Sequence, residues 1–186
     1  MVYLSSLWLP IVLSAVAVFI GSSILHMVLS YHKSDYSAMP GEDNVRAALR
    51  KEGVRPGHYY LPHCVDPKEM ATPEVKQKFE EGSVAFVTVL PNGVPSMGKP
   101  LASWFVYCLV IGTLVAYLTG RTVGAGAEYL TVFRVAGTAA FLGFAGATAS
   151  DSIWKAMPWR VTLKHIFDGL IYSLLTAGVF GWLWPS

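Results

Sequence analysis

Charged residues are scarce in this sequence. Only 14% of its 186 residues are Asp, Glu, Lys or Arg, whereas 53% are hydrophobic. An ordinary soluble domain has about a quarter of its residues charged, so this class is excluded. The net charge is only +2, and its basic residues are interleaved with acidic ones, so no nucleic-acid partner is expected. The composition predicts an integral membrane protein, whose first partner is the lipid bilayer.

Cysteine pairs and catalytic signatures are also missing. Cys64 lies in a polar segment and Cys108 in an apolar run, so no disulfide is expected between them. No serine stands in a G-x-S-x-G elbow, and no glycine-rich loop follows a strand to hold phosphate. No internal repeat or pair of interrupted apolar helices points to an alternating-access transporter. We therefore expect no enzyme activity, no catalytic residue and no cofactor.

Four apolar runs are long enough to cross a bilayer, which takes about 20 residues. They cover residues 7–29, 101–119, 129–149 and 166–184. The predicted fold is mainly α, a four-span transmembrane helical bundle with a small α+β segment between spans one and two. The corresponding divisions are the first transmembrane helix (1–31), the α+β module (32–100) and three further transmembrane helices (101–186).

Basic residues are concentrated on one side of these spans. The segments 30–100 and 150–165 carry nearly all of them, including Lys33, Lys99, Lys155 and Lys164 beside the spans, whereas the turn at 120–128 has only Arg121. By the positive-inside rule the large loop is cytoplasmic and both termini are periplasmic. The predicted location is a bacterial inner (plasma) membrane, crossed several times.

The polar segment contains signals for two helices and two strands. "PGEDNVRAALRKEG" has acids at its start, bases at its end and a glycine stop, and "TPEVKQKFEEG" offers Thr72 as N-cap and Pro73 as first residue. The stretches "HYYLP" and "SVAFVTVLP" are typical of strands.

Three charges lie within or at the ends of the spans. Asp168 is one turn inside span four, and Lys164 is four residues before it on the same helical face. We expect these two to form an interfacial ion pair; the alternative is a proton-relay or partner-binding carboxylate that points into the bundle. Arg134, in span three, is expected to meet Glu128 or a lipid phosphate.

Histidines raise the question of a metal site. His26 and His32 lie near the end of span one, and His58, His63 and Cys64 lie in the polar segment. Six residues of helix turn through about 600°, so His26 and His32 should face different ways, and His58 and His63 should project from opposite faces of a strand. We therefore assign no metal ligand from the sequence, although metal binding by these residues stays open.

Small residues in spans three and four predict a close helix-packing face. Its members are Ala139, Gly143, Ala147, Gly178 and Gly181. This face can pack the spans within one chain or dock other subunits or copies of the chain. We expect a non-catalytic accessory or scaffold subunit of a larger membrane assembly, respiratory, photosynthetic or other, or a self-associating oligomer; the alternative is a small transporter or metal-handling protein.

Three segments carry a resemblance to known sequences. They are "HMVLSYHKSDYSAMPGEDNVRAALR", "VAFVTVLPNGVPSMGK" and "DGLIYSLLTAGVFGWLWP". In these, nearly the whole chain resembles a widespread group of small bacterial inner-membrane proteins described only as hypothetical. The resemblance implies the architecture and a bacterial origin, and no activity.

Overall fold

The computed structural model describes all 186 residues, which form two compact units. One unit comprises Met1–Tyr36 and Ser96–Ser186, and the other comprises Ser37–Pro95. The chain is mainly helical, with four helices long and apolar enough to cross a membrane and one small two-stranded sheet. The coarse fold expected from composition is thus confirmed.

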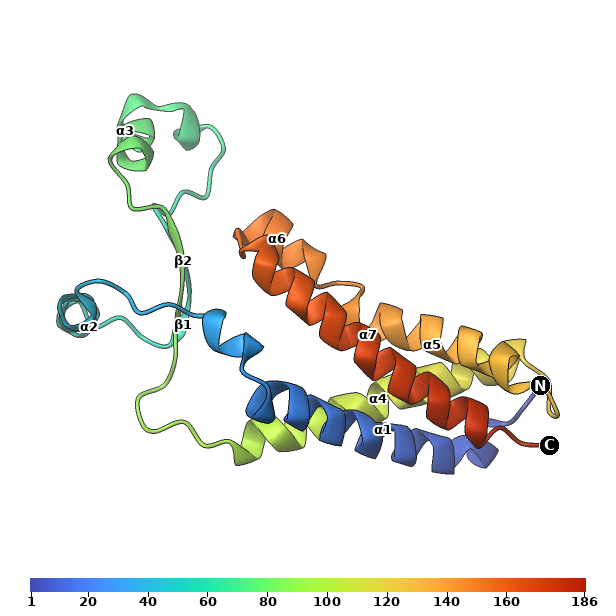
Figure 1. Cartoon of the computed structure of the whole chain (residues 1–186). Coiled ribbons are helices and arrows are strands. Elements are labelled where there is room, and N and C mark those ends of the chain that lie inside the picture. The colour runs from blue at the N-terminus through green and yellow to red at the C-terminus, as the bar shows by residue number, and fades with distance from the viewer. The chain divides into compact units, whose positions relative to one another are not determined.

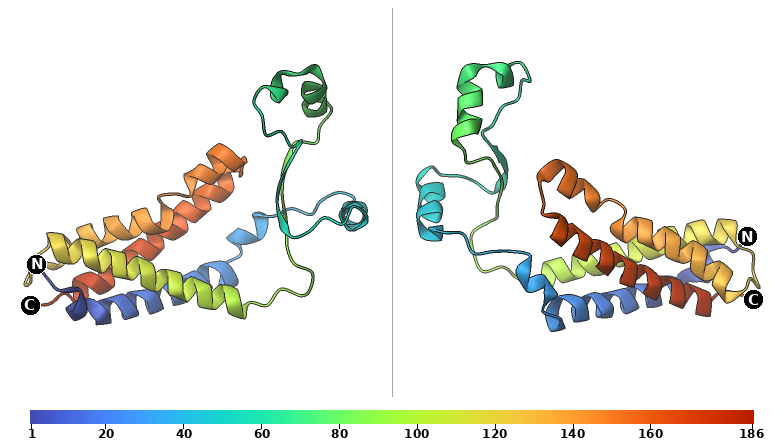
Figure 2. Two further views of the ribbon diagram at one scale, coloured as in Figure 1. Left: turned by 180° about the vertical axis from the view of Figure 1, so that it is seen from behind. Right: turned by 45° about the horizontal axis from the view of Figure 1, so that its top comes forward.

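The four candidate spans make up the first unit. The first, Leu4–Val28, contains α1 (Trp8–Ser23); the second is α4 (Gly98–Thr122); the third, Tyr129–Lys155, contains α5 (Tyr129–Ala145) and α6 (Ala149–Lys155); and the fourth is α7 (Trp159–Trp182). Helix α1 packs against α4 and α7, and α5 packs against the same two helices, which closes a four-membered ring (Figure 2). Both termini lie at one end of this bundle (Figure 1).

Glycines allow the spans to approach closely. A methyl group on Gly137 of α5 would lie 3.1 Å from the Cβ of Ala177 on α7, and one on Gly143 would lie 2.9 Å from Cδ1 of Ile111 on α4. Both distances are shorter than ordinary carbon–carbon contact. The core between the spans combines alanines and valines, such as Val132 on α5, with larger side chains such as Leu7 and Phe180.

The polar unit has the predicted elements. Helix α2 covers Glu42–Lys51, and helix α3 covers Pro73–Glu81 with Thr72 at its N-cap position and Gly82 at its end. Strand β1 (Gly57–Leu61) pairs antiparallel with β2 (Ala85–Val89), so that Gly57 lies opposite Val89. These two helices and two strands confirm the sequence-based prediction for this segment.

Candidate metal centre

The first span ends in a break of the regular α-helix. After α1 the helix widens into a π-helical turn at Ile24–Val28, Leu29 is extended with ψ 142°, and a 3-10 turn follows at Tyr31–Ser34. Because the helix does not continue, His32 folds back over His26. Their rings stack with centroids 4.1 Å apart and planes 24° apart. The prediction that these two histidines face different ways is therefore wrong.

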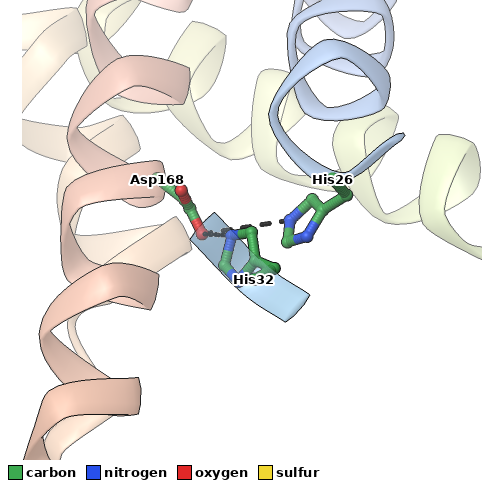
Figure 3. Close-up of side chains that lie close together, drawn as sticks. All are labelled: His26, His32 and Asp168. Carbon is green, nitrogen blue, oxygen red and sulfur yellow. Dashed lines mark ion pairs between the residues drawn. The ribbon is translucent and has the colours of Figure 1, made fainter. Parts of the chain in front are cut away.

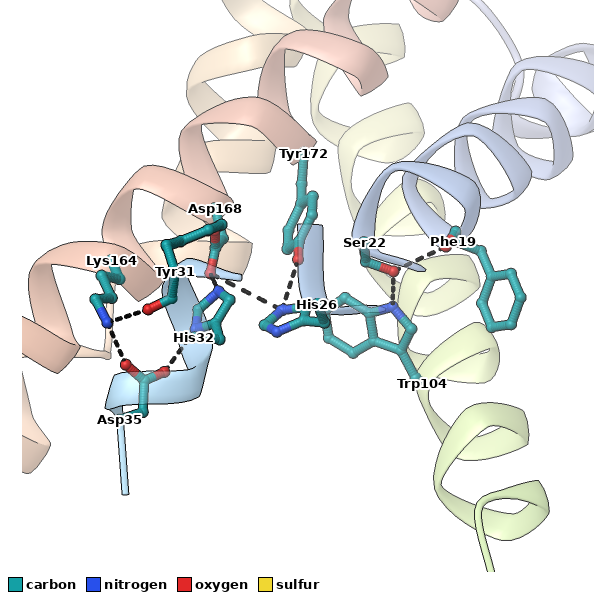
Figure 4. Close-up of polar contacts among 10 residues, drawn as sticks. All are labelled: Phe19, Ser22, His26, Tyr31, His32, Asp35, Trp104, Lys164, Asp168 and Tyr172. Carbon is teal, nitrogen blue, oxygen red and sulfur yellow. Dashed lines mark hydrogen bonds and ion pairs between the residues drawn. The ribbon is translucent and has the colours of Figure 1, made fainter. Parts of the chain in front are cut away.

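The turn also reaches the fourth span. Side chains from both segments form a polar group that we call the acid–histidine cluster (Figure 4). Its members are His26, Tyr31, His32, Asp35, Lys164, Asp168 and Tyr172.

Asp168 points into this cluster and is only 3% exposed. Its Oδ1 accepts a hydrogen bond from the Tyr31 hydroxyl. Its Oδ2 faces two imidazoles, at 3.0 Å from Nε2 of His32 and 3.9 Å from Nε2 of His26 (Figure 3). The expected ion pair with Lys164 does not form, so that prediction is wrong.

Lys164 instead holds the turn after the first span. Its Nζ lies 2.5 Å from Oδ1 of Asp35 and donates to the carbonyl oxygen of Tyr31 at 2.5 Å and to the hydroxyl of Ser34 at 2.9 Å. Because Lys164 is on α7, this contact ties the turn to the fourth span. Lys164 thus pairs with Asp35, 129 residues away in the sequence, and not with Asp168 on its own helix.

Two groups of the turn have shifted pKa values. Burial raises the pKa of the Asp35 carboxyl, but hydrogen bonds from Lys164 and His32, together with their charges, outweigh burial and leave that pKa below its ordinary value. Burial, the hydrogen bond to Asp168 and the nearby carboxylate charges raise the pKa of Tyr31. Asp35 is consequently a carboxylate at neutral pH, and Tyr31 keeps the proton that it donates.

His32 lies between the two carboxylates. Its Nδ1 is 2.6 Å from Oδ2 of Asp35, which accepts a hydrogen bond from this nitrogen. Its Nε2 is buried and, although 3.0 Å from Asp168, forms no hydrogen bond, because the two atoms are not aligned for one. Nε2 of His32 therefore faces Oδ2 of the buried Asp168 carboxylate without a hydrogen bond between them.

Three ligand atoms converge here. The nitrogens of His26 and His32 and a carboxylate oxygen of Asp168 all lie within 4.8 Å of one another. A tetrahedral ion with ligands at about 2.0–2.1 Å holds neighbouring ligand atoms about 3.3 Å apart, which falls between the 3.0 and 3.9 Å seen around Asp168. Two nearly parallel rings cannot both aim lone pairs at one ion, so one must turn. His26 has room to do so, since 45% of its side chain is exposed.

The hydrogen bonds around the candidate ligands are similar to those that orient ligands in known metal sites. A metal-bound histidine commonly donates its other N–H to a carboxylate, as His32 does to Asp35. The hydroxyl of Tyr172 lies 3.2 Å from Nε2 of His26, the nitrogen that also faces Asp168, so an ion bound to this nitrogen would replace that contact. With neutral histidines, the two carboxylates and the Lys164 ammonium sum to one negative charge (−2 + 1), which a cation would offset.

A second, overlapping group shares His32. It consists of His32, Asp35 and His165, whose ligand atoms also lie within 4.8 Å of one another. In this group Lys164 already occupies one oxygen of Asp35, and its charge opposes a bound cation. We therefore take the group around Asp168 as the candidate site.

Other residues singled out in the sequence lie elsewhere. His58 bonds Thr88 across the strand pair at 3.0 Å, and His63 and Cys64 form no ligand group with it. Arg134 lies exposed on α5 and forms no ion pair with Glu128, contrary to one of the two expectations for it.

The predicted packing face is partly used within the chain. Ala139 and Gly143 are half-buried, whereas Ala147 is exposed. Gly178 and Gly181 lie beside the ring of Tyr129, where a methyl group on Gly181 would come within 2.6 Å. Span three thus uses small residues against both α4 and α7.

Sequence reasoning missed Tyr31, Asp35 and Tyr172. The available signal was the polar stretch "SYHKSD" directly after an apolar run, with an acid one turn inside another span. No protein-family model, curated protein or solved structure matches this chain.

Proposed function

We propose that this chain is a multi-pass membrane protein that binds a divalent transition-metal ion through His26, His32 and Asp168. One observation carries the proposal: the buried Nε2 of His32 has no hydrogen bond and faces the free oxygen of the buried Asp168 carboxylate. A buried polar atom without a partner is uncommon in a folded protein, and an ion is one of its explanations. The alternative expected from the sequence, metal handling, is thus the function that the geometry supports best.

The ligand set favours particular ions. Imidazole nitrogens suit Zn²⁺, Fe²⁺, Ni²⁺ and Cu²⁺, whereas Mg²⁺ and Ca²⁺ prefer oxygen ligands. Three protein ligands leave at least one coordination position open for water or another ligand. Reversible loading is easier at such an open site than in a closed structural site. We propose handling of a Zn²⁺-class or Fe²⁺-class ion.

Orientation follows from the distribution of charge. The Lys and Arg residues beside the spans favour a cytoplasmic loop and periplasmic termini in a bacterial inner membrane. The acid–histidine cluster lies at the end of the first span from which the large loop departs. We propose that this cluster exchanges its ion with the cytoplasmic side.

Metal titration of the full chain tests this proposal. Purified protein in a neutral detergent is stripped with a chelator and titrated with Zn²⁺ by calorimetry. We expect one ion per chain and a loss of affinity of about 100-fold or more in Asp168→Asn and His32→Gln, since losing even the groups behind metal ligands costs roughly 10–100-fold. Asp151→Asn is the matched control, because Asp151 pairs with Lys155 on α6 away from the cluster. Equal binding by wild type, Asp168→Asn and His32→Gln, or no binding at all, contradicts the proposal.

An accessory or scaffold role stays a prediction. It relied on the small size of the chain, the absence of catalytic motifs, an incomplete polar module and abundant small-residue helix faces. In the predicted face, Gly143 and Gly181 already have close neighbours within the chain. Native mass measurement in mild detergent separates the two accounts. Co-purifying subunits or a stable oligomer without metal would favour the scaffold role.

A further inference from the structure

A second candidate site lies in the unit Ser37–Pro95, apart from the metal ligands. A cavity of about 470 Å³ is lined there by three arginines, Arg46, Arg50 and Arg55. The rest of its wall is apolar or neutral and comprises Leu49, Gly53, Val54, Pro56, Val89 and Asn92. No acidic side chain lines it.

The local fold explains why these arginines share one cavity. Arg46 and Arg50 are four residues apart on α2 and therefore lie on one face of the helix. The helix ends at Lys51, Gly53 two residues later is left-handed with a φ of 63°, and the amide of Val54 bonds back to the carbonyl oxygen of Leu49 at 3.0 Å. This turn folds the chain back, so that Arg55 lines the same cavity.

The charges in this cavity are poorly compensated. Arg46 lies 3.3 Å from Asp43, but both side chains are largely exposed, so the pair is weak. Arg50 and Arg55 form no ion pair in the chain. Arg50 also lies in the last turn of α2, where a cation complements the helix dipole. That role accounts for Arg50, and Arg46 has its weak pair with Asp43, whereas Arg55 has neither.

We propose that this cavity binds a phosphate group carried by a ligand. Guanidinium groups bind phosphate oxygens through paired, charge-assisted hydrogen bonds, and three of them around one cavity offer more donors than a single phosphate needs. The apolar wall of Leu49, Val54 and Val89 suits a ligand with a non-polar part beside the phosphate. The proposal is independent of the metal site.

The phosphate group can belong to a lipid headgroup or to a soluble compound. The unit is joined at both ends to membrane spans, and basic segments beside a bilayer attract anionic lipid headgroups. A soluble phosphate compound would be recognised by the same side chains. The test therefore needs separate arms for a lipid and a soluble phosphate.

Native mass spectrometry of the full chain in neutral detergent provides these arms. The probes are inorganic pyrophosphate, a short-chain phosphatidic acid, and short-chain phosphatidylcholine as the zwitterionic control. We expect saturable binding of at least one of the first two, weakened at least about tenfold in Arg50→Gln and in Arg55→Gln, since losing a hydrogen bond to a charged group costs that much or more. Lys78→Gln on α3 removes the same charge outside the cavity and is expected to bind as wild type does.

Each outcome decides the proposal. Binding of phosphatidic acid alone assigns a lipid headgroup, and binding of pyrophosphate assigns a soluble phosphate. Binding that falls equally in Lys78→Gln reflects net charge only and overturns the proposal. Absence of binding to both anionic probes, or equal retention of phosphatidylcholine, also overturns it.

Discussion

Nε2 of His32 lies 3.0 Å from Oδ2 of Asp168, yet no hydrogen bond joins the two atoms. The two atoms are not aligned for one, and the other ring nitrogen of His32 bonds Asp35 at 2.6 Å. Tyr31 similarly occupies the other oxygen of Asp168. Each of the two groups thus has one satisfied atom and one free atom, and the free atoms face each other.

Replacing Asp35 should weaken metal binding without removing a ligand. In Asp35→Asn the hydrogen bond that orients the His32 ring becomes weaker and the salt bridge to Lys164 is lost. We expect the Zn²⁺ Kd to rise roughly 10–100-fold, as for other groups behind metal ligands, with one ion per chain still bound. Calorimetric titration gives both values. An unchanged Kd would show that Asp35 does not support the site.

Charge exchange should distinguish the observed pairing from the expected one. If Lys164 pairs with Asp35, the double variant Lys164→Asp with Asp35→Lys keeps an ion pair between these two positions. The double variant Lys164→Asp with Asp168→Lys instead places two carboxylates, at 164 and 35, beside each other and buries an ammonium group at 168. We expect the first double variant to unfold closer to wild type than the second. Thermal unfolding in detergent ranks the two, and the reverse order contradicts the pairing.

A bulky residue at Gly143 should destabilise the bundle. The side chain of Gly143→Leu would overlap with Ile111, which a single added methyl group already approaches to 2.9 Å. Overpacking of this kind costs about 1–3 kcal/mol. Leu142→Ala is the neighbouring control, because Leu142 is 66% exposed on the outside of the bundle. Unfolding midpoints in a denaturing-detergent titration that are equal for the two variants would show that the contact is unimportant.

Cys64 should react slowly with thiol reagents at neutral pH. Partial burial, followed by the charge and hydrogen bond of Glu69, raises its pKa, so less of the reactive thiolate is present at pH 7 than for an ordinary cysteine. The deficit should shrink as the pH rises toward that pKa. Labelling rates of Cys64 between pH 7 and 10, compared with a cysteine placed at Glu52, measure this. A Cys64 rate equal to or above the rate at Glu52 at pH 7 contradicts the expected shift.

Membrane orientation can be checked with introduced cysteines. In Cys64→Ser protein, residues placed at Ser6 and Ser186 should react with a membrane-impermeant thiol reagent in intact cells, and one at Glu52 should not. All three react after the membrane is opened, which controls for accessibility. Reaction at Glu52 alone in intact cells would reverse the orientation.

Hydropathy and capping signals were enough to predict much of this fold. Apolar length predicts the four spans, and the Thr72, Pro73 and Gly82 positions predict α3 almost to the residue. Both kinds of signal depend only on residues that are close together in the sequence, so they can be recognised without a structure. The cluster depends on contacts between residues more than 100 positions apart, such as Lys164 with Asp35.

The histidine prediction failed for a local reason. Counting 100° per residue from His26 to His32 assumes an unbroken α-helix, and the π-helical turn and extended Leu29 remove that assumption. Likewise, Lys164 and Asp168 share a helical face, but their spacing could not show that the turn after the first span provides other partners. Lys164 pairs with Asp35, and Asp168 lies beside His32.

X-ray absorption at the metal edge tests the central claim most directly. The full chain in neutral detergent is loaded with one equivalent of Zn²⁺, and the spectra of wild type and His26→Gln are compared. Our account predicts nitrogen and oxygen ligands at about 2.0–2.1 Å, with outer-shell scattering from two imidazoles in wild type and from one in His26→Gln. A wild-type spectrum with no imidazole scattering, or one unchanged by His26→Gln, would contradict a metal site formed by His26, His32 and Asp168.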